Sequence, residues 1–154
     1  MAKKSKTLPI YVLSGPNLNL LGLREPEIYG RTTLAEIGRM VAKQAKTHGL
    51  SVVFRQSNHE GELIDWIQEA RAKAAGLIVN GGAYSHTSLA LHDALRAVDR
   101  PLVEVHLSNP FAREEFRHYS YISPLAKGVI VGFGAQSYVL AVDALASLIE
   151  SSAV

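Results

Sequence analysis

Residues 50–80, LSVVFRQSNHEGELIDWIQEARAKAAGLIVN, place two apolar, β-branched runs on either side of an amphipathic pattern. The runs at 50–56 and 77–80 predict strands, and residues 60–75 predict a helix. Its inward positions are Leu63, Ile64, Ile67 and Ala70. Ser57 and Glu60 stand at capping-box spacing before the helix, and Gly76 follows it. A strand, a helix and a second strand in this order predict a right-handed unit with parallel strands.

The same alternation continues along the whole chain. Further strands are predicted at 9–14, 102–107 and 129–133, and further helices at 33–48, 85–98 and 136–150, with a short helical piece at 113–116. Thr33 and Glu36 form a second capping-box spacing, and Gly49 follows that helix. The pattern predicts an α/β fold: a flavodoxin-like, doubly wound, five-stranded parallel sheet with helices on both faces. We expect residues 1–8 to form a flexible tail and residues 9–150 a single domain.

Composition narrows the possible functions. The chain has 154 residues, which is the size of one domain, and its 47% hydrophobic and 19% charged residues are typical of globular proteins. It has no cysteine, which excludes disulfides, a thiolate nucleophile and a Cys-ligated zinc site. A net charge of +2 gives no reason to expect nucleic acid or a membrane as partner. The basic N-terminal run lacks the apolar stretch of a signal peptide, so we expect a cytoplasmic protein.

Three polar segments follow predicted strands. They are GPNLN at 15–19, NGGAYSH at 80–86 and EVHLSN at 104–109. Because the carboxyl ends of parallel strands meet at one edge of a sheet, these Asn, His and Ser side chains should converge on one ligand site.

The sequence lacks the motifs of several common classes of binding site and enzyme. The turn after the first strand has neither a dinucleotide-binding nor a P-loop pattern, and GFG at 132–134 is typical of a tight turn. There is no nucleophile elbow of the α/β-hydrolases. The six histidines show no H-x-x-x-H or H-E-x-x-H spacing. We therefore expect no cofactor and no metal.

The motifs together resemble the type II 3-dehydroquinate dehydratases. The matching segments include GPNLNLLGLREPEIYG at 15–30, NGGAYSHTSLALHDAL at 80–95, VEVHLSN at 103–109, REEFRHYSYIS at 113–123 and GVIVGFGAQSY at 128–138. The resemblance extends in order from Ile10 to Ile149. It implies conversion of 3-dehydroquinate to 3-dehydroshikimate, in the shikimate pathway or in quinate breakdown, without metal or Schiff-base lysine. It also implies a homo-oligomer, a dodecamer built as a tetramer of trimers.

The reaction explains which residue types are needed. A base removes a proton beside the ketone, and the resulting enolate expels the β-hydroxyl with help from an acid. The resemblance implies that Tyr29 is the base and His106 the acid. A phenol has an ordinary pKa near 10 and needs positive neighbours to lose its proton, and the resemblance supplies Arg24 and Arg113. Glu104, two residues before His106 on the same side of a strand, could orient its imidazole.

Other matched positions would hold the substrate. The resemblance gives Asn17 to the enolate oxygen, Asn80, His86 and Arg117 to substrate hydroxyls, and Leu107 and Ser108 to the carboxylate. Asp93, seven residues after His86 and expected on the same helix, matches a residue that reaches a neighbouring subunit. Taken singly, these residues have plainer explanations: Tyr29 as a loop tyrosine, His106 as a structural histidine, Asn17 as a turn residue.

The chain also departs from the usual family pattern at four positions. Gly81 stands where proline is frequent and should loosen that turn; Phe111, Tyr119 and Ser137 are the other departures. They affect the expected affinity and not the expected reaction.

Two rival functions remain compatible with the sequence. One is a flavodoxin-like protein that binds flavin or a phosphorylated ligand, although the phosphate loop is missing. The other is a pseudoenzyme that keeps the fold as a binding module.

Overall fold

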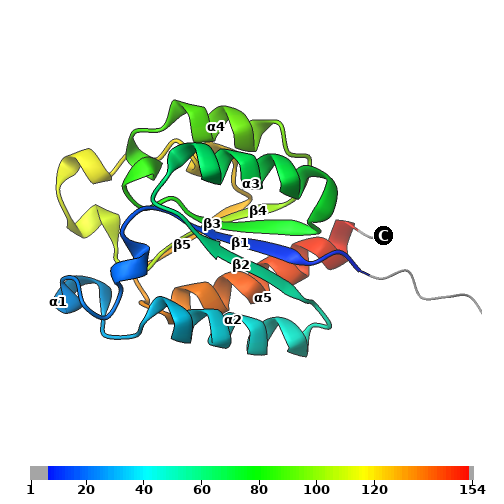
Figure 1. Ribbon diagram of the computed structural model, residues 1–154, viewed down its shortest axis with the longest axis horizontal. Helices are drawn as coiled ribbons and strands as arrows, with labels where there is room; N and C mark the ends of the chain where they lie inside the picture. The colour runs from blue at the N-terminus through cyan, green and yellow to red at the C-terminus, as the bar shows by residue number, and fades with distance from the viewer. Residues whose placement is uncertain (1–6, 153–154) are drawn as a thin grey trace, which may run out of the picture.

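The computed structural model describes residues 7–152 and contains one five-stranded sheet (Figure 1). The strands are β1 (Ile10–Ser14), β2 (Val52–Gln56), β3 (Gly76–Asn80), β4 (Leu102–His106) and β5 (Gly128–Val131). All pair in parallel, in the order β2-β1-β3-β4-β5. The predicted flavodoxin-like, doubly wound sheet is thereby confirmed. The tail predicted at 1–8 lies mostly outside the described residues; Thr7 and Leu8 are exposed.

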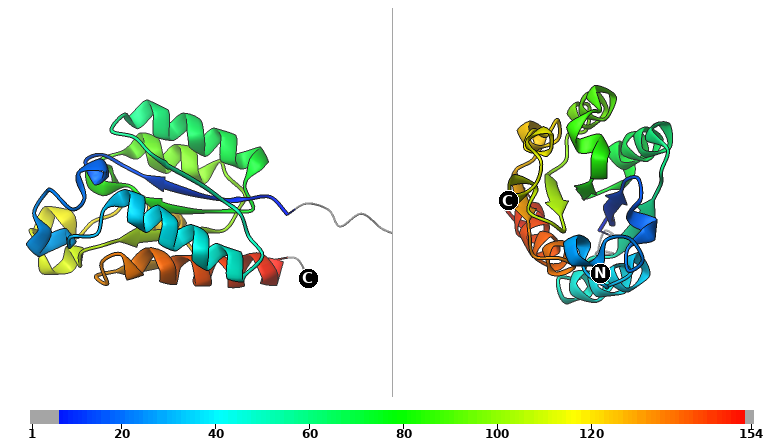
Figure 2. Two further views of the ribbon diagram at one scale, coloured as in Figure 1. Left: turned by 60° about the horizontal axis from the view of Figure 1, so that its bottom comes forward. Right: turned by 90° about the vertical axis from the view of Figure 1, so that its left-hand side faces the viewer.

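Helices cover both faces of the sheet (Figure 2). The helices are α1 (Pro26–Tyr29), α2 (Leu34–Thr47), α3 (Glu60–Lys73), α4 (Leu89–Arg96) and α5 (Gln136–Ser152). Helices α2 and α5 pack on one face, and α3 and α4 pack on the other, so each face has its own apolar core. Among residues 7–152, no helix has the length and apolar character needed to cross a membrane.

Helix α2, predicted at 33–48, shows how the local sequence sets a helix boundary. Thr33 accepts a hydrogen bond from the Glu36 amide, and the Glu36 carboxylate accepts one from the Thr33 amide, so the expected capping box is present. Ile37, Val41 and Ala45 are buried on its inner face. Gly49 has a φ of +69°, the conformation expected after a helix end.

Other predicted boundaries were wrong. Ser57 accepts from the His59 amide in a local turn instead of capping α3 through Glu60, and Gly76 belongs to β3. The helix predicted at 85–98 begins only at Leu89, because Ser88 caps it by accepting from the Leu91 amide. The residues before it form a separate 3-10 helix, Gly82–His86. His86 and Asp93 therefore do not share a helix.

Two smaller predictions also needed correction. The helical piece predicted at 113–116 is replaced by two 3-10 helices, Pro110–Ala112 and Glu115–Arg117. The last strand, predicted to reach residue 133, ends at Val131 because Gly132 turns the chain with a φ of +95°.

The turns after β1 and β3 approach each other closely. The Gly15 amide donates to the Asn80 carbonyl over 2.8 Å. A Cβ on Gly15 would collide with the carbonyl of Gly81. This contact between two backbones fixes how the first and third strand ends meet.

We predict that Gly15→Ala lowers the free energy of unfolding by about 1–3 kcal/mol, because the added methyl forces the two turns apart. Gly61→Ala is the matched control: Gly61 lies in α3 and a Cβ there meets nothing within 4 Å. It should raise stability by up to about 1 kcal/mol, because alanine favours helix. Urea denaturation of both variants measures the difference. Equal stabilities would contradict the close approach.

Candidate active site

A polar pocket lies at the carboxyl ends of β1, β3 and β4. The segments that contain α1 (blue) and residues 110–117 (yellow) gather at this end, and the described chain ends lie at the other (Figure 1). Ten of the residues singled out in the sequence line the pocket: Asn17, Arg24, Tyr29, Asn80, His86, His106, Leu107, Ser108, Arg113 and Arg117. Residues from the ends of β1, β3 and β4 and the connections that follow them therefore meet in one cavity.

Tyr29 stands between two arginines. It is the last residue of α1, a short helix that begins at Pro26 and was not predicted. The guanidinium carbons of Arg24 and Arg113 each lie 5.2 Å from the centroid of its ring. Arg113 also donates from Nη1 to the Ser108 hydroxyl over 3.4 Å. The phenol is thus half-buried beside two positive charges.

His106 is paired with a fully buried carboxylate. Its Nε2 lies 2.8 Å from Oε2 of Glu104, which has no exposed surface. Ser120 donates to the same oxygen over 2.7 Å, and Ser123 donates to Oε1. Burial raises the pKa of Glu104, but the bonds to His106, Ser123 and Ser120 outweigh it and leave that pKa below its ordinary value. Glu104 is therefore a carboxylate that can only accept.

His86 is held as a neutral ring. Its Nδ1 lies 2.8 Å from the carbonyl of Tyr119, and a carbonyl can only accept, so Nδ1 carries the proton. Burial lowers the pKa of His86; the bond to Tyr119 opposes this, while His106 and Arg117 lower it further. The His86 and His106 rings are stacked, with centroids 6.3 Å apart. His86 thus presents an unprotonated Nε2.

The two asparagines are fixed by neighbours. Asn17 has a φ of +67°, a conformation that asparagine tolerates. Its backbone amide donates to Oδ1 of Asn58 over 3.0 Å. Asn80 is buried at the end of β3, and its Oδ1 accepts from the Gly82 amide over 3.1 Å. Both side chains line the pocket.

Two predicted site residues do not line the pocket. Glu104 lies behind His106, as just described. Asp93 is exposed on α4. Arg117 lines the pocket, and its Nε donates to Glu114 over 2.8 Å.

The four departures from the family pattern have local consequences. The turn at Gly81 is packed, because a Cβ there would lie 2.5 Å from Ser85 Oγ and 2.8 Å from Ile122 Cδ1. Ser137 is buried and accepts from the Phe133 amide, which ties the turn before α5. Phe111 and Tyr119 are exposed.

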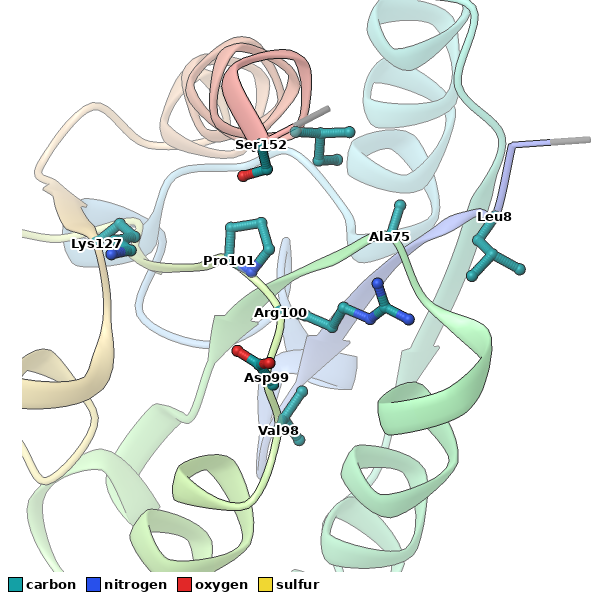
Figure 3. A pocket seen from close by; sticks show the side chains of 9 residues that line it. Leu8, Ala75, Val98, Asp99, Arg100, Pro101, Lys127 and Ser152 are labelled. Atoms are coloured by element: carbon teal, nitrogen blue, oxygen red, sulfur yellow. The ribbon is translucent and has the colours of Figure 1, made fainter. Parts of the chain in front are cut away.

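A larger cavity lies at the opposite edge of the sheet (Figure 3). It encloses about 550 Å³ between the start of β1, the turn before β4 and the end of α5. Leu8, Ala75 and Val98 supply apolar surface, and Asp99, Arg100 and Lys127 are the charged residues that line it. The nine described residues that line it include no histidine or tyrosine. Acid–base chemistry is thus better served by the smaller pocket.

Metal ligands do not gather in the described part of the chain. Among residues 7–152, no three His, Asp or Glu side chains are close enough together to hold a metal ion.

Sequence reasoning missed the residues that hold the pocket residues in place. Asn58, in the turn after β2, accepts from the backbone amide of Asn17 and was not singled out in the sequence. Ser120 and Ser123 bind Glu104, and Tyr138 lies behind Asn80. Serines in a long connection and a tyrosine on a helix carry no spacing signal of their own.

The fold and the pocket define an α/β protein with acid–base side chains at the carboxyl edge of a parallel sheet. Residues 8–146 match the family model described as dehydroquinase class II. A relative from Phenylobacterium zucineum (strain HLK1), named 3-dehydroquinate dehydratase, is 64% identical over 140 residues, 91% of this chain and 97% of the relative. A relative of the same name from Rhizobium meliloti (strain 1021) is 62% identical over 143 residues, with 93% and 97% covered.

A solved structure indicates the same family as these relatives. The crystal structure of type II dehydroquinase from Propionibacterium acnes superposes with a TM-score of 0.87 at 41% identity, covering 95% of this chain and 99% of that one. The chain belongs to the class II dehydroquinase family, and it is an enzyme of the dehydroquinase class.

The buried carboxylate gives a pH prediction. Since the pKa of Glu104 is depressed in the folded state, its contribution to stability is fully present above the unfolded pKa of about 4.3 and is lost as the pH falls through the folded pKa. Glu104→Gln should therefore cost about 3 kcal/mol near pH 7 and clearly less near pH 3.5. Urea denaturation at both pH values measures the difference. Glu62→Gln, at an exposed site on α3, is the control. A cost for Glu104→Gln that does not change with pH would contradict the conclusion that the folded state lowers the pKa of Glu104.

Proposed function

We propose that this chain removes water from 3-dehydroquinate to give 3-dehydroshikimate through an enolate, with Tyr29 as the base and His106 as the acid. The reaction would serve the shikimate pathway. The observation that carries the proposal is the convergence, in one pocket, of a tyrosine beside two arginines and a histidine paired with a buried carboxylate. Membership of the dehydroquinase family supports the choice of substrate.

Proton removal is assigned to Tyr29. The two guanidinium groups stabilise a phenolate, which can accept the proton beside the substrate ketone. Asn17, whose left-handed backbone is fixed by Asn58, is the proposed donor to the enolate oxygen. A correctly placed donor there is worth about 3 kcal/mol of transition-state stabilisation.

Loss of the hydroxyl is assigned to His106. Because Glu104 only accepts, Nε2 of His106 carries a proton, and a second proton on Nδ1 makes the imidazolium. We propose that this Nδ1 proton goes to the leaving hydroxyl. Glu104 stabilises the charged ring and fixes its orientation, which is the role of a positioning residue.

The remaining pocket residues would bind the substrate. Asn80, His86 and Arg117 are proposed to hold its hydroxyls, and the Leu107 and Ser108 amides with the Ser108 hydroxyl its carboxylate. Arg113 lies 3.4 Å from that hydroxyl and adds a positive charge on the same side. A neutral His86 suits a hydroxyl better than a carboxylate, because its unprotonated Nε2 accepts.

We expect the purified protein to convert 3-dehydroquinate without added metal or cofactor, because the proposed steps use only side chains. Ultraviolet absorbance of the conjugated product measures the rate. A chelator should leave the rate unchanged, and borohydride with substrate should not inactivate the enzyme. Inactivation by borohydride would indicate a lysine imine and contradict the proposal.

Arg24→Ala tests the activation of Tyr29. One positive charge at this distance is worth roughly 1–3 kcal/mol, so kcat should fall by about tenfold or more and the pH–rate profile should move to higher pH. Arg31→Ala, an exposed arginine of the same connection, is the matched control and should change neither. An unshifted profile in Arg24→Ala would remove Arg24 from the mechanism.

We further propose a cytoplasmic homo-oligomer, a dodecamer of four trimers, in which residues 9–150 form one catalytic domain. Exposed Asp93 on α4 is free to reach a neighbouring subunit's pocket, which it could not do from the interior. Light scattering combined with the activity assay should show active oligomers, and Asp93→Ala should raise KM. A fully active monomer would contradict this arrangement.

A further inference from the structure

Behind the pocket, one tyrosine is buried in the core between β1, β3 and α5. Tyr138 has no exposed surface, and its hydroxyl lies 3.0 Å from Ser14 Oγ and 3.0 Å from Asn80 Nδ2. Ser14 and Asn80 are the last residues of neighbouring strands β1 and β3. The hydroxyl therefore joins the two strand ends behind Asn80, which lines the pocket.

The neighbours of the Asn80 amide determine its orientation in this network. The Gly82 amide can only donate, so the atom of Asn80 that faces it is the oxygen Oδ1. The nitrogen Nδ2 then faces Tyr138 and donates one hydrogen to its hydroxyl oxygen. Burial raises the pKa of Tyr138 to about 12, so the hydroxyl keeps its proton, and Ser14 Oγ, 3.0 Å away, is placed to accept it.

One hydrogen of the Asn80 amide is left over by this arrangement. Nδ2 carries two hydrogens and gives one to Tyr138, while Oδ1 is engaged by Gly82. Asn80 lines the pocket, so the second hydrogen is available to a ligand. At Nδ2, Asn80 therefore offers a donor to the ligand, whereas His86 offers an acceptor through Nε2.

We propose that Tyr138 is a positioning residue that locks the Asn80 amide with its N–H toward the pocket, so that the substrate oxygen at Asn80 must accept a hydrogen bond. The inference rests on the proposed function, since it names how one substrate hydroxyl is recognised. Without the Tyr138 oxygen, Nδ2 loses its buried acceptor and the amide is free to rotate. Tyr138 does not touch the reacting atoms, so its effect is on binding.

A double-mutant cycle tests the link between the two residues. Tyr138→Phe keeps the ring and removes only the hydroxyl; it should raise KM by about threefold to tenfold, the range for one hydrogen bond, with kcat changed by less than about twofold. Asn80→Ala should raise KM at least as much. If Tyr138 acts through Asn80, the double variant should match Asn80→Ala alone. Multiplied effects, or an unchanged KM in Tyr138→Phe, would overturn the proposal.

Tyr11→Phe is the matched control. Tyr11 is also buried, but its hydroxyl donates to Glu69 on the other face of the sheet, away from the pocket. Its loss should lower the unfolding midpoint without altering KM. If Tyr138→Phe does not fold, Ser14→Ala removes the acceptor of the Tyr138 proton and should raise KM in the same direction; an unchanged KM there also counts against the proposal. A wild-type protein without dehydratase activity would refute the proposed function, whereas an active one with an unresponsive Tyr138→Phe refutes only this inference.

Discussion

Glu104 places a carboxylate inside the sheet, where a charge without partners would be very costly. Three donors meet this demand, from His106, Ser120 and Ser123. The two serines belong to the connection between β4 and β5, so the buried charge holds this connection against the end of β4. Tyr119 belongs to the same connection, and its carbonyl orients His86. One buried charge thus sets the positions of both histidines.

A second, neutral network supports the other side of the pocket. Ser14, Asn80 and Tyr138 are joined by hydrogen bonds within the core, and Gly15 and Gly81 bring the backbones of the two turns together. Polar groups that are buried and hydrogen-bonded to each other restrict one another's orientation, so they contribute to orientation as well as to stability. The pocket therefore has a fixed pattern of donors and acceptors before any ligand binds, which lowers the cost of binding.

The sequence was sufficient for the five-stranded, doubly wound parallel sheet and for the edge where the pocket forms. Short buried runs and intervening helical patterns are set by burial on both faces, so they are visible in the sequence. The predicted boundaries were wrong where a polar side chain binds a local partner. Ser57 accepts from the His59 amide, and Ser88 caps α4, which begins at Leu89, three residues after the 3-10 helix that ends at His86. Such competition between local turns and caps is decided by tertiary packing.

The residues of the pocket wall were named through family motifs, but their supports were not. Ser120, Ser123, Asn58 and Tyr138 act through contacts across 16 to 58 positions in sequence, and such contacts leave no periodic signal. In the sequence, Tyr138 cannot be told from an ordinary apolar residue of a helical core, because its ring is buried in the same way. Only the position of its hydroxyl distinguishes it.

The division of labour between Tyr29 and His106 is tested most directly by exchange of the substrate proton beside the ketone with deuterium from solvent, followed by nuclear magnetic resonance. In His106→Asn the enolate can form but cannot readily lose its hydroxyl, so exchange should continue while dehydration slows by about 10²-fold or more. In Tyr29→Phe both exchange and dehydration should stop, although substrate still binds. Exchange at the wild-type rate in Tyr29→Phe would show that another group removes the proton and would contradict the assignment of the base.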